Sequence, residues 1–206
     1  ASATSLLADD LQWSTDDVRQ FGTAIDEETD RLGALVANLL DMTRLSTGPL
    51  PVRQLDVGLD ELVLAAVTSL GERAGATQLE IDVDEALPAV RTDPHLVERA
   101  LANVVDNALA WAPEGTTVRI EACIKGEQAQ VRVIDQGPGI PPSEREDVFR
   151  PFQRLGDRSN GPGVGLGLAV ARGMLQAVGG TLRVEETSGG GTTMVMGLPL
   201  TPGPDR

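Results

Sequence analysis

The sequence predicts an α+β fold in which one long helix precedes a domain of strands and helices. Alternating apolar residues over 78–83, 118–124 and 129–135 are typical of strands that bury one face. Apolar residues at helical spacing over 59–70 and 94–111 predict helices between them. At 206 residues, the chain can hold one such domain with a helical appendage.

The appendage is a helix predicted over about 15–46. Ser14 and Asp17 fit a capping box at its start, and Gly48 with Pro49 ends it. Its apolar residues keep a seven-residue period in two rows: Val18, Ile25, Leu32 and Leu39, and Phe21, Leu35 and Met42, with Glu28 in the gap. This seam predicts pairing with a preceding helix over 1–12 and with a second chain. The alternative is a helix that packs only on its own domain.

The domain elements follow in chain order. We expect a short strand over 50–56, a helix over 59–70, a strand over 78–83, a helix over 94–111 capped by Asp93, a hairpin of 118–124 and 129–135, a connection over 136–163, a helix ending at Gly179, and strands over 181–186 and 193–199. So long a connection in a compact domain is typical of a binding element. Phe149 and Phe152 are expected to anchor it.

Composition limits the classes of partner. The net charge of −14 argues against nucleic acid or an anionic membrane as the main partner. The single cysteine, Cys123, excludes an internal disulfide and fits a reducing compartment. No run of 18 apolar residues and no signal peptide is present, so no membrane span is expected. The chain begins without Met, as a fragment or a processed product would.

A carboxylate ends the strand over 129–135. Asp135 continues the apolar row of Val131 and Val133, where a carboxylate is costly to bury without a hydrogen-bonding partner. The exocyclic amino group of a purine would be such a partner, and Gly137 and Gly139 leave room for a flat ring near the backbone. The alternative is a solvated turn, since Asp and Gly are common turn residues.

A second glycine cluster, Gly161 to Gly167 at alternate positions, opens a helix. Free backbone N–H groups and the helix dipole favour an anion at such an end. The cluster is not a Walker A loop, because no Lys-Ser/Thr pair follows it. It is not a dinucleotide loop either, because no strand precedes Gly163. The alternative, glycines for close packing, suits Gly173 better than this cluster.

Two asparagines lie one turn apart on the helix over 94–111. Asn is a poor residue for a helix interior, so Asn103 and Asn107 at i,i+4 require an explanation. Their amide oxygens could hold a hydrated Mg²⁺, a cation that takes oxygen ligands. The alternative is a hydrogen-bonded polar edge.

The order of these motifs resembles the catalytic region of sensor histidine kinases of two-component systems. Their ATP-binding domain belongs to the group shared with gyrase B, Hsp90 and MutL. The N box is similar to 103–107, the first glycine box to 135–139, the phenylalanine box to 149–152, the second glycine box to 163–168 and the last box to 189–192. The segments 27–48 and 163–173 are similar to the potassium- and turgor-sensing branch of that family.

The resemblance implies the fold and the roles of residues. The fold would be an α/β sandwich, a mixed sheet with helices on one face, preceded by a helical dimerisation segment. Asp135 would bind the adenine amino group beside Gly137, Gly139 and Thr192, and Asn107 would ligate Mg²⁺ with Asn103 assisting. Backbone groups would contact the ATP phosphates at Gly163, Val164, Gly165, Leu166, Gly167 and Leu168, and Arg154 would reach the γ-phosphate.

The chain departs from the family pattern in three respects. The family usually carries Lys three residues after the second N-box Asn, where this chain has Ala110. The segment with the phospho-accepting His, and the acidic residue beside that His, are absent, and the only histidine is His95. We therefore expect ATP binding without autophosphorylation on histidine, and transfer only to an acceptor helix supplied in trans.

The resemblance also implies the domain limits and the partners. Residues 1–48 would be partial dimerisation and phosphotransfer helices, 49–200 the catalytic domain, and 201–206 a disordered tail. The partners would be ATP, a response regulator and a second copy of the chain, with no nucleic acid and no membrane contact. The chain would be the cytoplasmic portion of an inner-membrane sensor. The alternatives are a non-catalytic nucleotide-sensing module and an ATP-driven clamp.

Overall fold

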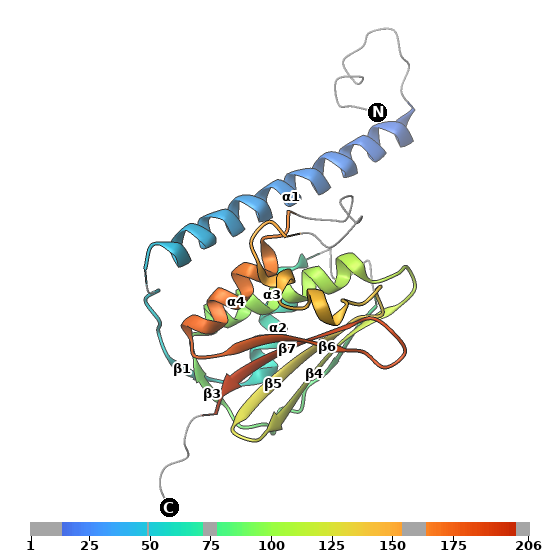
Figure 1. Cartoon of the computed structure of the whole chain (residues 1–206). Coiled ribbons are helices and arrows are strands. Elements are labelled where there is room, and N and C mark those ends of the chain that lie inside the picture. The colour runs from blue at the N-terminus through green and yellow to red at the C-terminus, as the bar shows by residue number, and fades with distance from the viewer. Residues whose placement is uncertain (1–13, 49, 72–77, 154–163, 201–206) are drawn as a thin grey trace, which may run out of the picture.

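A computed structural model describes residues 14–48, 50–71, 78–153 and 164–200 (Figure 1). The elements in chain order are α1 (Thr15–Ser46), β1 (Leu55–Val57), α2 (Leu59–Ser69), β2 (Gln78–Asp82), β3 (Val90–Thr92), α3 (Pro94–Trp111), β4 (Thr117–Lys125), β5 (Gln128–Ile134), the short 3-10 turns η3 (Pro142–Glu144) and η4 (Asp147–Phe149), α4 (Gly167–Ala177), β6 (Thr181–Glu186) and β7 (Thr192–Pro199). The predicted tail over 201–206 and the predicted helix over 1–12 lie outside the described residues.

The main sheet has five strands in the order β2-β4-β5-β7-β6. Only β2 and β4 run parallel; the other neighbours pair antiparallel, and β4 and β5 form the predicted hairpin. This pairing confirms the mixed sheet. It also sets the end of β5 beside the start of β7, since Ile134 pairs with Thr193.

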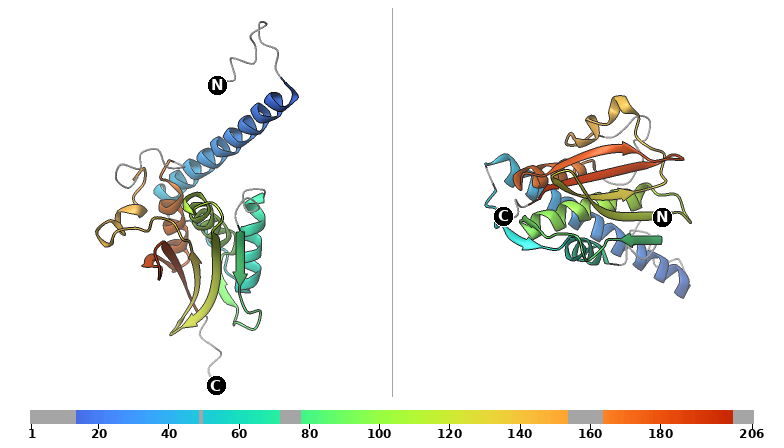
Figure 2. Two further views of the ribbon diagram at one scale, coloured as in Figure 1. Left: turned by 90° about the vertical axis from the view of Figure 1, so that its right-hand side faces the viewer. Right: turned by 90° about the horizontal axis from the view of Figure 1, so that it is seen from below.

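The helices α2, α3 and α4 lie on one side of this sheet (Figure 2). Alternation along the strands turns the apolar residues toward these helices, and arginines such as Arg119, Arg132 and Arg183 occupy the alternate positions that face away. The largest fully buried core side chains include Leu59, Val97, Leu101, Val104, Ile120, Leu175, Met194 and Met196. The core is therefore aliphatic, and α3 lies at its centre between α2 and α4.

A second, two-stranded sheet was only half predicted. The strand expected over 50–56 begins later and ends one residue beyond that range: β1 is Leu55–Val57, which pairs antiparallel with Val90–Thr92. The partner β3 was not predicted, because three residues are too few for an alternating pattern to be recognised. This small sheet leads directly into Asp93, whose carboxylate accepts hydrogen bonds from the backbone N–H groups of His95 and Leu96 and so caps α3 as expected.

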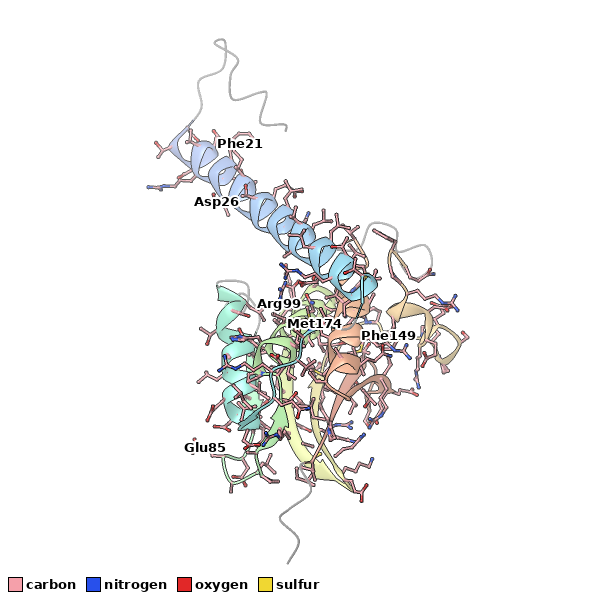
Figure 3. All side chains as sticks on the ribbon, turned by 90° about the vertical axis from the view of Figure 1, so that its left-hand side faces the viewer. Phe21, Asp26, Glu85, Arg99, Phe149 and Met174 are labelled. Atoms are coloured by element: carbon pink, nitrogen blue, oxygen red, sulfur yellow. The ribbon has the colours of Figure 1, made fainter. Side chains whose placement is uncertain are left out.

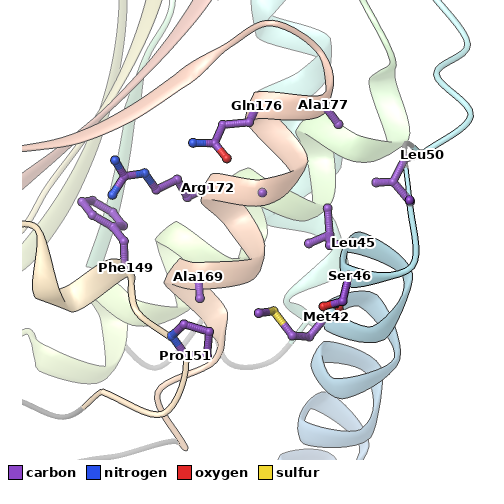
Figure 4. A pocket seen from close by; sticks show the side chains of 12 residues that line it. Met42, Leu45, Ser46, Leu50, Phe149, Pro151, Ala169, Arg172, Gln176 and Ala177 are labelled. Atoms are coloured by element: carbon purple, nitrogen blue, oxygen red, sulfur yellow. The ribbon is translucent and has the colours of Figure 1, made fainter.

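Helix α1 begins at the predicted capping box, in which the Ser14 hydroxyl oxygen accepts from the Asp17 N–H and the Asp17 carboxylate accepts from the Ser14 N–H. Its C-terminal end packs on the domain. Leu45 lies against α4 at Gly173, where a Cβ would come within 2.7 Å of a Leu45 methyl carbon. A groove of about 610 Å³ runs beside this contact, between α1, η4 and α4 (Figure 4).

One of the two apolar rows of α1 is exposed to solvent in the described part of the chain. Val18, Ile25, Leu32 and Leu39 are each 47–56% exposed, and Val36 and Leu40 extend the same apolar surface. The last turns of α1 therefore pack on the domain, while the pairing of the exposed row with another helix stays a prediction. No helix in the described part of the chain is long and apolar enough to span a bilayer.

Candidate nucleotide-binding site

Asp135 lies at the end of β5, buried on the helix side of the sheet with 3% of its surface exposed. Its Oδ1 accepts hydrogen bonds from the backbone N–H of Gly137 at 2.8 Å and of Thr192 at 3.0 Å. None of the described residues donates a hydrogen bond to Oδ2. The carboxylate thus has one oxygen fixed by the backbone and one acceptor for another donor, as the base-binding interpretation requires.

Burial raises the pKa of Asp135, and the hydrogen bonds from the Gly137 and Thr192 N–H groups oppose this increase only in part. A carboxylate held at such a cost is typical of a functional site. The solvated-turn alternative does not fit this geometry, because the side chain is neither exposed nor confined to its own turn.

Two glycines allow the backbone to close around Asp135. A Cβ at Gly137 would lie 2.8 Å from the carbonyl oxygen of Trp111, the last residue of α3. A Cβ at Gly191 would lie 2.1 Å from the backbone oxygen of Asp135. Only residues without a side chain fit these positions. Gly139 lies on the other side of this turn, next to the Gly191 carbonyl.

Asn103 and Asn107 lie half-buried on α3, on a flank of its core-facing surface. The backbone of Gly167, the first residue of α4, is adjacent to Asn103, since a Cβ there would be 3.7 Å from Oδ1. Position 110 is exposed and carries Ala. Amide oxygens are suitable ligands for a hydrated Mg²⁺, so these residues fit the ion that the motif implies. The described residues hold no cluster of three His, Cys, Asp or Glu that could bind a metal.

The second glycine cluster precedes α4, as predicted. Val164 is exposed, Gly165 and Gly167 are half-buried, Leu166 is buried, and Leu168 packs against the core. Leu166 occupies the N-cap position and its side chain forms no capping hydrogen bond. The first turn of α4 contains no acidic residue. The start of α4 therefore has no side-chain cap and no acidic residue, and it lies beside Asn103, so an anion would be favoured there. Gly163 and Arg154 lie outside the described residues.

The connection after β5 is anchored by Phe149, but not by Phe152. Phe149 is buried, and the guanidinium of Arg172 lies 4.8 Å from its ring centroid while pairing with Glu146 at 2.9 Å. Phe152 is 62% exposed, so its predicted anchoring role is wrong. Its backbone adopts the left-handed conformation with φ of 62°, which the sequence pattern could not reveal. Its N–H donates to the Gly165 carbonyl at 2.9 Å.

Helix α3 joins the two ends of the site. Its C-terminus at Trp111 contacts the turn that holds Asp135, and Asn103 contacts the start of α4. Trp111 lies eight positions after Asn103 on α3, a distance of about 12 Å along a helix axis. A nucleotide can lie along this span with its base at Asp135 and its phosphates at Gly167. The sequence predicted both ends, but the role of Gly191 and the contact with the Trp111 carbonyl appeared only in the structure.

The family model described as histidine kinase-, DNA gyrase B-, and HSP90-like ATPase matches residues 92–202, more than half of the chain. The sensor protein KdpD of Mycobacterium tuberculosis is 41% identical over 203 residues, which covers 96% of this chain and 23% of that protein.

Two solved structures share the fold. The mycobacterial sensor histidine kinase MprB has a TM-score of 0.63 at 33% identity, covering 73% of this chain and 99% of that one. Full-length ShkA in complex with AMPPNP has a TM-score of 0.73 at 25% identity, covering 95% of this chain and 41% of that one.

Proposed function

This chain belongs to the histidine kinase-, DNA gyrase B-, and HSP90-like ATPase family, and we propose that it is the ATP-binding catalytic region of a two-component sensor histidine kinase. The observation that carries this proposal is the arrangement along α3. The buried carboxylate of Asp135 lies at the C-terminal end of the helix, and the start of α4, which has no side-chain cap, meets Asn103 at its middle.

In the proposed complex, the free Oδ2 of Asp135 accepts a hydrogen bond from the adenine amino group. Gly137, Gly139 and Thr192 line the base, and the backbone from Gly163 to Leu168 contacts the phosphates. Asn107, assisted by Asn103, would hold a hydrated Mg²⁺, which when bound neutralises phosphate charge. The chain's own contribution is then to fix the triphosphate in line with an acceptor and to exclude water.

The acceptor would be a histidine on another helix. The only histidine of these 206 residues is His95, whose exposed side chain lies at the first turn of α3 beside Glu98. His95 lies at the opposite end of α3 from Trp111, and it is not part of the apolar seam of α1. We propose that this chain does not phosphorylate itself on histidine, that it transfers the γ-phosphoryl group to an acceptor helix supplied in trans, and that a response-regulator aspartate is the final acceptor.

The helix α1 favours a kinase over an ATP-driven clamp. Its exposed row of Val18, Ile25, Leu32 and Leu39 directly precedes the domain, and it requires a partner helix. We propose that residues 1–48 dimerise and that 49–200 form the catalytic domain. ATP and a response regulator are cytoplasmic molecules, so the proposed site of action is the cytoplasm, next to a membrane-embedded sensor.

Transfer of radiolabelled phosphate tests this function. The chain is incubated with γ-labelled Mg·ATP and a helical hairpin that carries the family's acceptor segment, with a His→Gln version of the hairpin as the matched control. Label that appears on the hairpin with the acceptor His, and not on the His→Gln hairpin, supports the kinase function. Binding of ATP without transfer would instead favour the nucleotide-sensing module, for which the missing cation at Ala110 is the supporting observation.

A further inference from the structure

Arg99 is the only arginine or lysine on α3, and it lies one turn before Asn103. Residues four apart on a helix are neighbours on one face, separated by about 6 Å along the axis. Arg99, Asn103 and Asn107 therefore form one row that leads from the phosphate end of the site toward the start of the helix. The long, flexible side chain of Arg99 can extend toward the phosphates from the N-terminal side of the two asparagines. Position 110, which carries Ala, lies on their C-terminal side.

A triphosphate needs cationic partners. Arg172 is stacked on Phe149 and paired with Glu146, Arg150 pairs with Asp147 at 3.0 Å, and Arg99 pairs with Asp41. Of these three arginines, Arg99 is the one on α3, in line with the two asparagines. Guanidinium groups suit phosphate oxygens because they donate in a planar fork.

In the structure, the guanidinium of Arg99 is held by a carboxylate of α1. Its Nη2 contacts Oδ2 of Asp41, a residue with only 3% of its surface exposed, while the Arg99 side chain is 42% exposed. Figure 3 shows Arg99 beneath the C-terminal half of α1. Arg44, which is on the same helix as Asp41, has its Nη1 3.8 Å from the other carboxylate oxygen, Oδ1. The Asp41 carboxylate thus presents an anionic oxygen to the Arg99 guanidinium, as a phosphate group would.

We infer that Arg99 is a binding residue for the γ-phosphate of ATP, and that Asp41 and this phosphate compete for its guanidinium. The inference rests on the proposed nucleotide site. ATP binding then releases the C-terminal half of α1 from α3, whereas ADP, which lacks the γ-phosphate, leaves the Asp41–Arg99 pair in place. In this way the presence of the γ-phosphate changes the packing of α1 through the side chain of Arg99.

The setting of Asp41 makes this exchange feasible. Burial raises the pKa of Asp41, and the positive charges of Arg99 and Arg44 offset that effect only in part. The ionised carboxylate is therefore held at a cost, and a multiply charged phosphate can replace it. The Leu45 contact with Gly173 remains as an apolar hinge about which α1 can move.

The test compares ATP and ADP affinities by calorimetry in four variants of the whole chain. Arg99→Gln should weaken ATP binding at least tenfold and leave ADP binding within about twofold, because it removes a charge-assisted contact. Arg99→Lys should keep part of the ATP preference. Asp41→Asn should tighten ATP but not ADP, and Arg119→Gln, which removes a cation on the far face of the sheet, should change neither.

Hydrogen exchange over 36–46 supplies the second readout. Exchange should rise with ATP and not with ADP in the wild type, and the ATP effect should be lost in Arg99→Gln. Equal losses of ATP and ADP affinity in Arg99→Gln, or equal exchange with both nucleotides, would overturn the inference while leaving the nucleotide site intact. If the wild type binds neither nucleotide, the proposed function fails first and this inference fails with it.

Discussion

The backbone N–H of Thr192 donates to Oδ1 of Asp135 at 3.0 Å, and the Asp135 N–H donates to the Thr192 carbonyl at 2.9 Å. This double link fixes the residue that follows β5 against the first residue of β7. It also fixes the orientation of the carboxylate, because Oδ1 is held by the backbone and Oδ2 receives no hydrogen bond from the described residues. The specificity of the proposed site depends on this relationship.

Asp135→Asn should fold at least as stably as the wild type at pH 7. The amide oxygen can still accept the two backbone hydrogen bonds, and the cost of burying a charge is removed. Chemical denaturation measures the unfolding free energy. A loss of more than about 2 kcal/mol, the range expected for an unsatisfied buried group, would show that the charge itself is structural.

The same pair of proteins should differ in their pH dependence. Because the pKa of Asp135 is raised on folding, the folded chain keeps a proton that the unfolded chain has already lost in the window above the ordinary carboxyl value of 3.8. The free energy of unfolding therefore falls as pH rises through that window, and Asn does not titrate. The stability advantage of Asp135→Asn should grow as pH rises through the folded pKa and then stay constant. An advantage that shrinks with rising pH would contradict the raised pKa.

Gly191→Ala should damage the site through the backbone. The new Cβ would meet the Asp135 carbonyl at 2.1 Å, so the start of β7 must shift, and with it the Thr192 N–H. We expect a loss of about 2–4 kcal/mol of stability, and weaker ATP binding. Gly189→Ala is the matched control, because Gly189 also has a positive φ, 92°, but its Cβ would meet nothing within 4 Å. Equal effects of the two substitutions would rule out the close approach as the cause.

Asn107→Ala should lower affinity for Mg·ATP about tenfold, as expected for the loss of a hydrogen-bonded ligand to a charged group. It should have little effect on ATP titrated in EDTA. Calorimetry with and without Mg²⁺ measures both affinities. A loss of the same size under both conditions would assign Asn107 to the nucleotide or to the polar edge of α3 rather than to the metal.

Leu32→Glu should reduce self-association without affecting the nucleotide site. Leu32 is 56% exposed on the apolar row of α1, so its replacement costs the fold little, but it would place a charge inside the proposed seam. Arg19→Glu changes charge at an exposed position that lies away from both apolar rows and serves as the control. Sedimentation equilibrium should give a weaker dimer for Leu32→Glu alone. A monomeric wild type would contradict the proposed dimerisation.

Much of the fold followed from local patterns in the sequence. The capping boxes, heptads and alternating strands identified α1, α3 and the β4–β5 hairpin to within a residue or two, because those elements carry long periodic signals. The strand β3 has only three residues and was missed. The exposed position of Phe152 was mispredicted, because a left-handed residue leaves no mark in an apolar pattern.

The candidate site, like the fold, could be predicted only in part from the sequence. Asp135 and the asparagines could be chosen from the sequence, since a carboxylate in an apolar row and two asparagines in a helix are locally anomalous. The closeness of Gly191 to Asp135, and of Asp41 to Arg99, joins residues more than 50 positions apart. Such pairs depend on strand register and helix docking, which no local pattern specifies.

The central claim, that Asp135 binds the base of ATP, is tested most directly by titrating Mg·ATP into the wild type and into Asp135→Asn. In the variant, the amide oxygen stays with the Gly137 and Thr192 N–H groups, so its NH₂ faces the adenine amino group, donor against donor. The account predicts binding by the wild type and none by the folded variant up to millimolar nucleotide. Equal affinities in the two proteins would contradict it.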